Sequence, residues 1–371
     1  MKPVICFFES ESYIYSLDYT KKTCSAEQTV TQFLNEIDTQ NPAAMKIVQI
    51  DFDAYSDLNT KVQTDLYPSK KACVYILKHY EVLSLREIQM KHTSLLRQKA
   101  DFLKTAIFQL QTEKKQFTEN VKKIRKWISE GRFYQVNLTA AFKASFLMDS
   151  LQFFLTMNSH FSGDYKCYLP SSVATSDHSV ISFSPELFLE KKGNVLRTAP
   201  IKGSISIQEN AEINLMKNKK EDAELSMIVD LLRNDFNSLE TKSSAQVTQH
   251  RQLMNLNYIH HTYSEVQITT EKKLPFILEH VMPGGSISGC PKQESLIAIQ
   301  ELEPHRRQAY TGTIGWWNKN EFKLNVTIRT FVQTENTYLY YAGCGIVYDS
   351  DPEKEFAELI NKAGILNVQY T

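Results

Sequence analysis

Two charged side chains stand where the surrounding sequence is strand-like and apolar, and together they can support proton transfer and nucleophilic attack. Lys202 lies in "RTAPIKGSIS", and Glu186 follows Pro185 in "SFSPELFLE". Burial raises the pKa of a carboxyl and lowers that of an amine, which favours a proton donor and a neutral nucleophile near physiological pH. A structural ion pair between the two is the alternative on these residues alone.

Four glutamates occur in pairs at helical spacing, in two segments far apart in the chain. Glu221 and Glu224 lie in "EDAELSMIVDLL", with Glu224 over the apolar face, and Glu355 and Glu358 repeat the spacing near the C-terminus. Such carboxylates provide the oxygen ligands that Mg²⁺ prefers. The alternatives are a basic partner at the rim for Glu224 and an ordinary i,i+4 pair of Glu358 with Lys362.

Glycine-rich turns and one arginine favour an anionic ligand. Gly284 and Gly285 in "MPGGSISGCPK" precede a helix and permit backbone N–H groups to converge on a carboxylate or phosphate. Gly343 and Gly345 occur in "YAGCGIVYD". Arg329 lies among apolar residues in "NVTIRTF", where either an anionic ligand or an internal carboxylate has to offset its charge.

Alternation and helical periodicity predict the elements that position these residues. We expect strands in "KPVICFFE", "YIYSL" and "KIVQIDFDAY", a helix in "TVTQFLNEIDTQ", and two amphipathic helices over 92–130 that end at Gly131. Further on, we expect strands that follow one another directly, helices near 150–161 and at 218–235, a Gly-rich turn with a helix within 282–302, and a last helix at 351–366. Asp351 before Pro352 is a predicted N-cap. Directly joined strands predict antiparallel sheets in one mixed α/β body.

Charge and cysteine content restrict the class of protein. The 371 residues include 42 Lys and Arg against 42 Asp and Glu, so no net field attracts nucleic acid or an anionic membrane. The six cysteines lack metal-binding spacing, the first residues lack the apolar run of a signal peptide, and no apolar stretch reaches the length of a membrane span. We therefore expect a soluble cytoplasmic protein whose partners include neither nucleic acid nor membrane.

The order and wording of the motifs resemble the chorismate-utilising enzymes, which include anthranilate synthase component I, aminodeoxychorismate synthase component I, isochorismate synthase and salicylate synthase. The resemblance covers roughly residues 131–364 and is carried by "GRFYQVNLT", "SPELFLE", "PIKGS", "EDAELSMIVDLLRND", "PGGSISGCPK", "ELEPHRRQAYTGTIGWW", "TIRTF" and "GCGIVYDSDPEKEFAELINKA". It implies an α+β fold, a two-layered α/β sandwich of the anthranilate synthase component I type with large antiparallel sheets around a central cleft. We expect one chorismate-binding domain over 1–371, with a shortened, divergent part at 1–130 and a catalytic core at 131–364.

The resemblance also implies roles for individual residues in Mg²⁺-dependent chemistry on chorismate. Glu224 and Glu358 would hold Mg²⁺ on the ring carboxylate, with Glu221 and Glu355 acting through water. Glu186 would handle the proton at the C4 hydroxyl. The implied substrate-binding positions are Gln135, Ser184, His261, Gly284, Gly285, Ser286, Thr313, Arg329, Gly343, Gly345 and Lys362.

Two positions distinguish the branches of this family. Enzymes that add water carry a lysine base where this chain has Gln135, and anthranilate synthases have a small residue at the position of Lys202. Lys202 in "PIKG" is similar to the aminodeoxychorismate synthases, in which the lysine amine attacks C2 of chorismate while the C4 hydroxyl leaves with a proton from the glutamate. Ammonia then enters at C4 and expels the lysine.

The implied function is therefore aminodeoxychorismate synthase component I, a Mg²⁺-dependent amination of chorismate that leads to 4-aminobenzoate and folate. Ammonia would come from a separate glutamine amidotransferase subunit. The alternatives are anthranilate synthase component I and a catalytically silent chorismate-binding sensor. One departure from the family pattern concerns the site: Cys344 replaces the middle glycine of a Gly-Gly-Gly turn, and we expect its side chain to narrow the cleft or to alter the nearby backbone.

Overall fold

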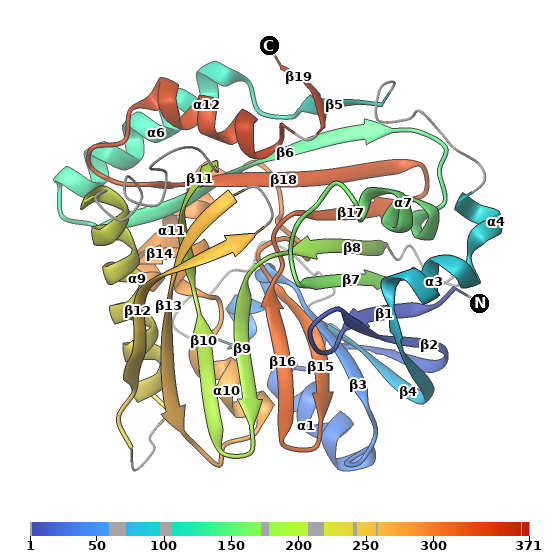
Figure 1. Ribbon diagram of the computed structural model, residues 1–371. Coiled ribbons are helices and arrows are strands. Elements are labelled where there is room, and N and C mark those ends of the chain that lie inside the picture. Colours follow the sequence, from blue (N-terminus) through green and yellow to red (C-terminus); the bar gives the residue numbers. More distant parts are fainter. Residues whose placement is uncertain are drawn as a thin grey trace.

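The computed structural model of the protein consists mainly of antiparallel strand pairs that are covered by helices (Figure 1). It describes residues 2–58, 72–96, 106–171, 178–206, 219–239, 243–256, 259–364 and 366–370, without the side chains of 56, 203–206, 219–221, 223, 254–256 and 259–261. Among the described strands, the one parallel pair joins β5 (Ile107–Leu110) to β19 (Asn367–Gln369). A continuous path of strand pairs links two sets of strands, which cross in Figure 1.

The first set runs down the view in Figure 1. Each of its strands pairs with the next in the order β12 (Gln246–Leu256), β13 (Ile259–Thr269), β10 (Val195–Ala199), β9 (Leu187–Lys192), β16 (Glu321–Val326), β15 (Thr313–Asn318), β3 (Lys46–Ile50) and β4 (Ala72–Ser84). The strand β11 (Ile201–Ser206) pairs with β13 beyond the end of β10, which brings Lys202 into this set.

The second set runs across the view, from β6 and β18 in the upper part to β1 and β2 at the right. From β4 the path passes through β2 (Ser12–Thr23), β1 (Val4–Phe7), β7 (Tyr165–Leu169), β8 (Ser179–Ser184), β17 (Thr330–Thr334), β18 (Thr337–Ile346) and β6 (Gln135–Ser145). Both β5 and β14 (Gly289–Cys290) pair with β6. The glycine-containing end of β18 therefore lies directly beside the start of β6.

Helices cover both sets of strands. In Figure 1, α6 (Lys114–Ser129) and α12 (Pro352–Lys362) lie side by side over β18, whereas α9 (Lys219–Asn237) packs on β13. The others are α1 (Val30–Gln40), α2 (Tyr55–Leu58), α3 (Leu85–Lys91), α4 (Thr93–Leu96), α7 (Ser150–Met157), α10 (Leu274–Val281), α11 (Lys292–Leu302), and the short 3₁₀ turns η1 (Phe52–Ala54) and η2 (Gly285–Ile287). The predicted α+β architecture with large antiparallel sheets is confirmed.

The start of α12 follows from its sequence. The Asp351 carboxylate accepts hydrogen bonds from the backbone N–H groups of Glu353 and Lys354 at 3.1 and 3.0 Å, and Pro352 occupies the first turn. Such a cap satisfies N–H groups that have no partner inside the helix. The predicted N-cap is confirmed, and it sets the position from which α12 presents its glutamates.

The segment 92–130 differs from the prediction of two amphipathic helices. Residues 107–110 form the strand β5, paired in parallel with β19 and antiparallel with β6. Only α6, together with the short α4, is helical among the described residues of this segment. The apolar spacing around Phe108 fits a helix, but pairing with strands distant in sequence outweighs that local preference.

No helix in the described ranges is both long enough and apolar enough to cross a bilayer.

Candidate active site

A cavity of about 750 Å³ opens where the two sets of strands meet α9 and α12. The residues that line it also come from the link between β8 and β9, from β11, η2 and β18, and from the loop before β17. The predicted site residues that line it are Glu186, Lys202, Glu224, Ser286, Arg329, Gly343, Gly345, Glu355, Glu358 and Lys362. The fold therefore brings together ten predicted positions that span nearly 180 residues of sequence.

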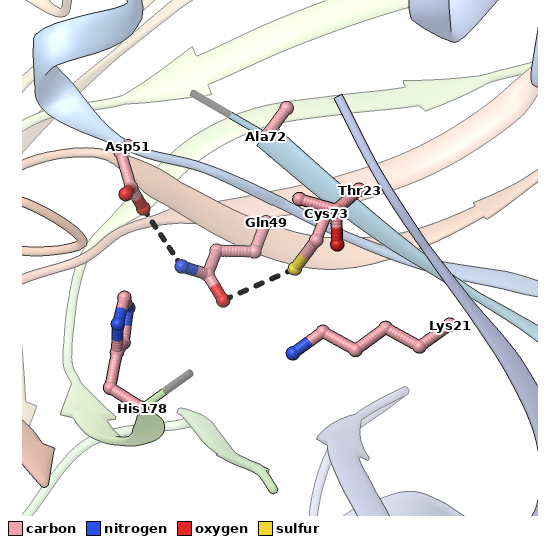
Figure 2. A pocket seen from close by; sticks show the side chains of 7 residues that line it. All are labelled: Lys21, Thr23, Gln49, Asp51, Ala72, Cys73 and His178. Atoms are coloured by element: carbon pink, nitrogen blue, oxygen red, sulfur yellow. Dashed lines mark hydrogen bonds between the residues drawn. The ribbon is translucent and has the colours of Figure 1, made fainter. Parts of the chain in front are cut away.

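A second hollow lies among β2, β3 and β4 and is far smaller (Figure 2). Its volume is about 10 Å³, which is the space of roughly one water molecule. Gln49 donates to the Asp51 carboxylate at 2.8 Å and accepts from the Cys73 thiol at 3.5 Å. This hollow is too small for an organic ligand, so the larger cavity is the candidate site.

Glu186 is a buried carboxyl held in place by its backbone and by Ser286. It sits in the two-residue link between β8 and β9, and 6% of its surface is exposed. The Ser286 hydroxyl donates to the carboxylate Oε1 at 3.2 Å. Burial raises the pKa of Glu186 to about 7, while the charge of Lys202 and the Ser286 hydrogen bond act in the opposite direction. Near neutral pH this group can therefore donate a proton.

Lys202 reaches the cavity from β11. Its carbonyl accepts a hydrogen bond from the Thr262 hydroxyl at 2.6 Å, and the pairing of β11 with β13 is irregular directly after it. Among the described residues, no carboxylate lies within 4.0 Å of the Lys202 amine, although its charge acts on Glu186. Within the described part of the chain Lys202 therefore forms no ion pair, and the residue lines the cavity.

Arg329 provides a cation without an internal carboxylate partner in the part of the chain that the structure describes. It has a left-handed backbone with φ of 50°, and its guanidinium donates to the carbonyl and hydroxyl of Ser162 at 3.0 and 3.3 Å. Burial lowers the pKa of Arg329. Because both partners are neutral, a carboxylate that enters the cavity would gain a charge-assisted hydrogen bond.

Acidic groups of α12 gather beside the end of β18. The Glu355 carboxylate is buried and accepts from the Ser350 hydroxyl at 2.6 Å, whereas Glu358 is half-exposed and forms an ion pair with Lys362 at 2.7 Å. Lys362 also donates to the Gly343 carbonyl at 2.8 Å. Burial opposes the charge of Lys362, but nearby Cys344 and Glu358 outweigh it and raise the pKa.

The donor set fits a divalent cation. Carboxylates of Glu224, Glu355 and Glu358 all reach the cavity wall, which matches the oxygen ligands of Mg²⁺. The side chain of Glu221 lies outside the described residues, as does that of His261.

Five predicted substrate-binding residues do not line the cavity, and the structure gives each another role. The Ser184 hydroxyl accepts from the Glu186 N–H at 3.2 Å and donates to the Val326 carbonyl at 2.6 Å, so it positions Glu186 from behind. The Thr313 hydroxyl donates to the Asn325 carbonyl at 2.7 Å within the sheet. Both lie behind the cavity wall because their hydroxyls satisfy backbone groups there. The other three are Gln135, Gly284 and Gly285.

Close packing against neighbouring elements explains why Gln135, Gly284 and Gly285 do not line the cavity. A Cβ atom at Gly284 would lie 3.2 Å from the Phe188 ring, and one at Gly285 would overlap the Leu231 side chain of α9. Gln135 is buried behind Gly345, where a Cβ atom would lie 2.5 Å from the Gln135 amide nitrogen. These glycines thus permit elements to approach one another behind the cavity.

Cys344 also differs from expectation. Its side chain is fully buried, does not line the cavity and donates from Sγ to the Glu355 carbonyl at 3.4 Å. Burial raises the pKa of the thiol to about 12. The side chain lies between β18 and α12 and does not narrow the cleft.

Sequence reasoning missed much of the polar and aromatic wall. Tyr310 and Tyr341 stack with ring centroids 5.3 Å apart at the cavity, and Asn361 faces it from α12. The additional lining residues include Asn137, His160, Ser162 and Tyr340. Asn361 follows Glu358 by three residues, a spacing that predicts the same helix face, whereas the tyrosines cannot be distinguished in sequence from core residues.

Comparisons with known proteins agree on one family. The model of a family described as chorismate binding enzyme matches residues 10–367. Aminodeoxychorismate synthase component 1 of Bacillus subtilis (strain 168) is 35% identical over 256 residues, which cover 67% of this chain and 54% of that relative. Anthranilate synthase component 1 of the same strain is 30% identical over 312 residues, which cover 80% of this chain and 60% of that relative. The chain thus aligns with little more than half the length of these relatives.

A solved structure shows the same fold. Anthranilate synthase component I from Streptococcus pneumoniae TIGR4 superposes with a TM-score of 0.80 at 23% identity, covering 96% of this chain and 92% of the other.

Proposed function

This chain belongs to the family of chorismate binding enzymes, and on that premise we propose that it acts as an aminodeoxychorismate synthase component I. It would convert chorismate and ammonia into 4-amino-4-deoxychorismate and water, a route to 4-aminobenzoate and folate. The observation that carries this proposal is that Lys202 lines the same cavity as Glu186, whose carboxyl has a raised pKa. The 35% identity to an aminodeoxychorismate synthase component 1 supports it.

The proposed chemistry divides the substitution at C4 into two displacements. The lone pair of the Lys202 amine forms a bond to C2 of the ring, the double bond shifts, and the C4 hydroxyl leaves as water with the Glu186 proton. Ammonia then bonds to C4 and the Lys202–C2 bond breaks, which restores the amine. The Lys202 nitrogen leaves with the protons it had on entry, and the ammonium formed at C4 gives up one proton, which restores the one that Glu186 gave to the leaving hydroxyl.

Substrate carboxylates would be held by the cations of the cavity. Arg329, whose described partners are neutral, would accept one carboxylate, and Lys362 at the end of α12 would contribute to the other. Ser286 would keep Glu186 turned toward the ring. Glu224, Glu355 and Glu358 would hold Mg²⁺. When bound, the ion acts as a Lewis acid on the C1 carboxylate and makes the ring electron-poor.

Ammonia would come from a separate glutamine amidotransferase subunit. The relatives are named as the first component of their synthases, which supports a second component. All six cysteines are free thiols, which favours a reducing compartment, and we place the enzyme in the cytoplasm.

Anthranilate synthase component I is the second candidate, because a relative with that name is 30% identical over 80% of this chain. Lys202 weighs against it, since the resemblance associates a small residue at this position with anthranilate synthesis. A catalytically silent sensor would have no use for a nucleophile and a proton donor in the cavity.

Product analysis decides among these functions. The full chain is incubated with chorismate, Mg²⁺ and ammonium, and the products are separated by liquid chromatography with mass detection. We expect 4-amino-4-deoxychorismate and a covalent adduct on Lys202. Lys202→Ala should abolish both, whereas Lys192→Ala, which removes an exposed lysine of β9, should keep both. Anthranilate from the wild type, unchanged turnover in Lys202→Ala, or chorismate binding without turnover would each contradict the proposal.

A further inference from the structure

Cys344 places a sulfur atom next to the carboxylates that we assign to the metal. Its Sγ and one carboxylate oxygen from each of Glu355 and Glu358 all lie within 4.8 Å of one another. The thiol comes from β18 and the carboxylates from α12, and these two elements pack directly together. Sulfur and oxygen donors of three side chains therefore converge between β18 and α12, and the two glutamates among them also line the cavity.

The spacing suits direct coordination. Zn²⁺ binds thiolate sulfur at about 2.3 Å and carboxylate oxygen at about 2.0–2.2 Å, so three ligands of one ion lie roughly 3–4 Å apart. The three donor atoms, all within 4.8 Å of one another, lie close to such a separation. A thiolate ligand favours Zn²⁺ and Co²⁺, whereas Mg²⁺ prefers oxygen.

The cluster already holds a cation. The Lys362 ammonium lies 2.7 Å from the Glu358 carboxylate and 2.8 Å from the Gly343 carbonyl, directly beside Cys344 in the strand. Glu355 and Glu358 both line the cavity, so an ion can reach them from solvent. A divalent ion at this point would replace Lys362 as the partner of Glu358.

We propose that Cys344, Glu355 and Glu358 bind a thiophilic divalent cation such as Zn²⁺ or Co²⁺, in competition with the Mg²⁺ of the proposed function, on which this inference rests. The ion forms a bond to Sγ as the thiol proton passes to solvent. The remaining coordination positions are open toward the cavity. Because Glu355 and Glu358 serve both ions, occupation by Zn²⁺ prevents Mg²⁺ from binding.

Co²⁺ is the probe, since thiolate coordination produces a charge-transfer absorption that oxygen ligands do not. The reduced, metal-free full chain is titrated with Co²⁺ alone while absorbance and proton release are recorded. We expect one thiolate-to-cobalt band and one released proton in the wild type, and displacement of the band by Zn²⁺. Cys344→Ala should lose the band and the proton, while Cys290→Ala, which removes a partly exposed thiol outside the cluster, should retain both.

Because the Cys344 side chain is fully buried, Cys344→Ala can lose the band through misfolding, and a second variant tests the site independently. Glu358→Gln changes a half-exposed carboxylate and should weaken Co²⁺ binding at least about tenfold with an unchanged circular dichroism spectrum. Absence of the band in the wild type, or its persistence in folded Cys344→Ala, would overturn the inference. Wild-type protein that aminates chorismate without a cobalt band refutes the inference alone, whereas a band without turnover refutes the proposed function alone.

Discussion

The proton of Glu186 is governed by effects of opposite sign. Burial favours the neutral carboxylic acid, while the Lys202 charge and the Ser286 hydroxyl favour the carboxylate. Burial is the largest effect, so the pKa rises from 4.5 to about 7 and a substantial fraction of the protein carries this proton at neutral pH. A carboxyl in water would be ionised there and could not serve as a general acid.

Turnover should therefore depend on the acid form of Glu186. Because the protonated fraction falls as the pH rises through about 7, kcat/KM should decline over that range. Glu186→Gln cannot donate a proton and should lose about 10²- to 10⁴-fold in kcat/KM, together with this pH dependence. Rates of amination measured between pH 5.5 and about 8.5 test both expectations.

Ser286→Ala is the matched variant for that profile. It removes a hydrogen bond that lowers the pKa of Glu186, so the decline in kcat/KM should move to higher pH. A profile that stays in place, or moves to lower pH, would show that another group controls the rate.

At the scale of elements, the turn that carries Ser286 is fixed by close contacts on two sides. Gly285 packs against Leu231 of α9, and Gly289 pairs with Val136 of β6. Gly289 has φ of 149°, and a Cβ atom there would overlap the Gln135 carbonyl and approach the Ser295 hydroxyl to 2.5 Å. The hydrogen bond from Ser286 to Glu186 thus depends on two glycines, Gly285 and Gly289, that lie outside the cavity.

Gly289→Ala should be strongly destabilising, because the added methyl group meets backbone that cannot rotate away. We expect a loss on the order of 3 kcal/mol or more in the free energy of unfolding, measured with urea. Gly193→Ala is the control: Gly193 also has positive φ, at 55°, but nothing lies within 4 Å of the added Cβ atom. It should cost only about 1 kcal/mol. Equal losses in both variants would mean that backbone conformation, rather than the contact, is limiting.

At the scale of the whole molecule, one buried arginine joins segments that surround the cavity. Arg307 donates to the Asn137 carbonyl of β6 at 2.7 Å and to the Ile287 carbonyl of η2 at 2.8 Å, and it forms an ion pair with Glu303 at 2.7 Å. Its guanidinium also lies 4.3 Å from the Phe52 ring of η1. The N-terminal part and the core are therefore tied together at a point behind the site.

Arg307→Met should leave the Glu303 charge buried without its main partner, which costs about 3–5 kcal/mol in the free energy of unfolding. Lys122→Met removes an exposed i,i+3 pair with Glu119 and should cost less than about 1 kcal/mol. Thermal and urea unfolding provide the measurement. Comparable stability of the two variants would show that Arg307 does not hold the segments together.

The sequence by itself was sufficient for features encoded by local patterns. Apolar periodicity located α9, the Asp351 cap located the start of α12, and the order of the motifs indicated the family and most of the charged cavity wall. The predictions of α9 and of the start of α12 succeeded because helical periodicity and capping depend on residues within one or two turns.

Only the tertiary structure decided which way several side chains face and which segments pair. Residues 107–110 became a strand through contacts with β19, more than 250 residues later. The hydroxyls of Ser184 and Thr313 serve the backbone behind the cavity, and the Cys344 thiol turns toward Glu355. The physical reason is that a hydrogen-bond partner or packing neighbour far along the chain leaves no periodic trace in the local sequence, although its free energy can exceed local preferences.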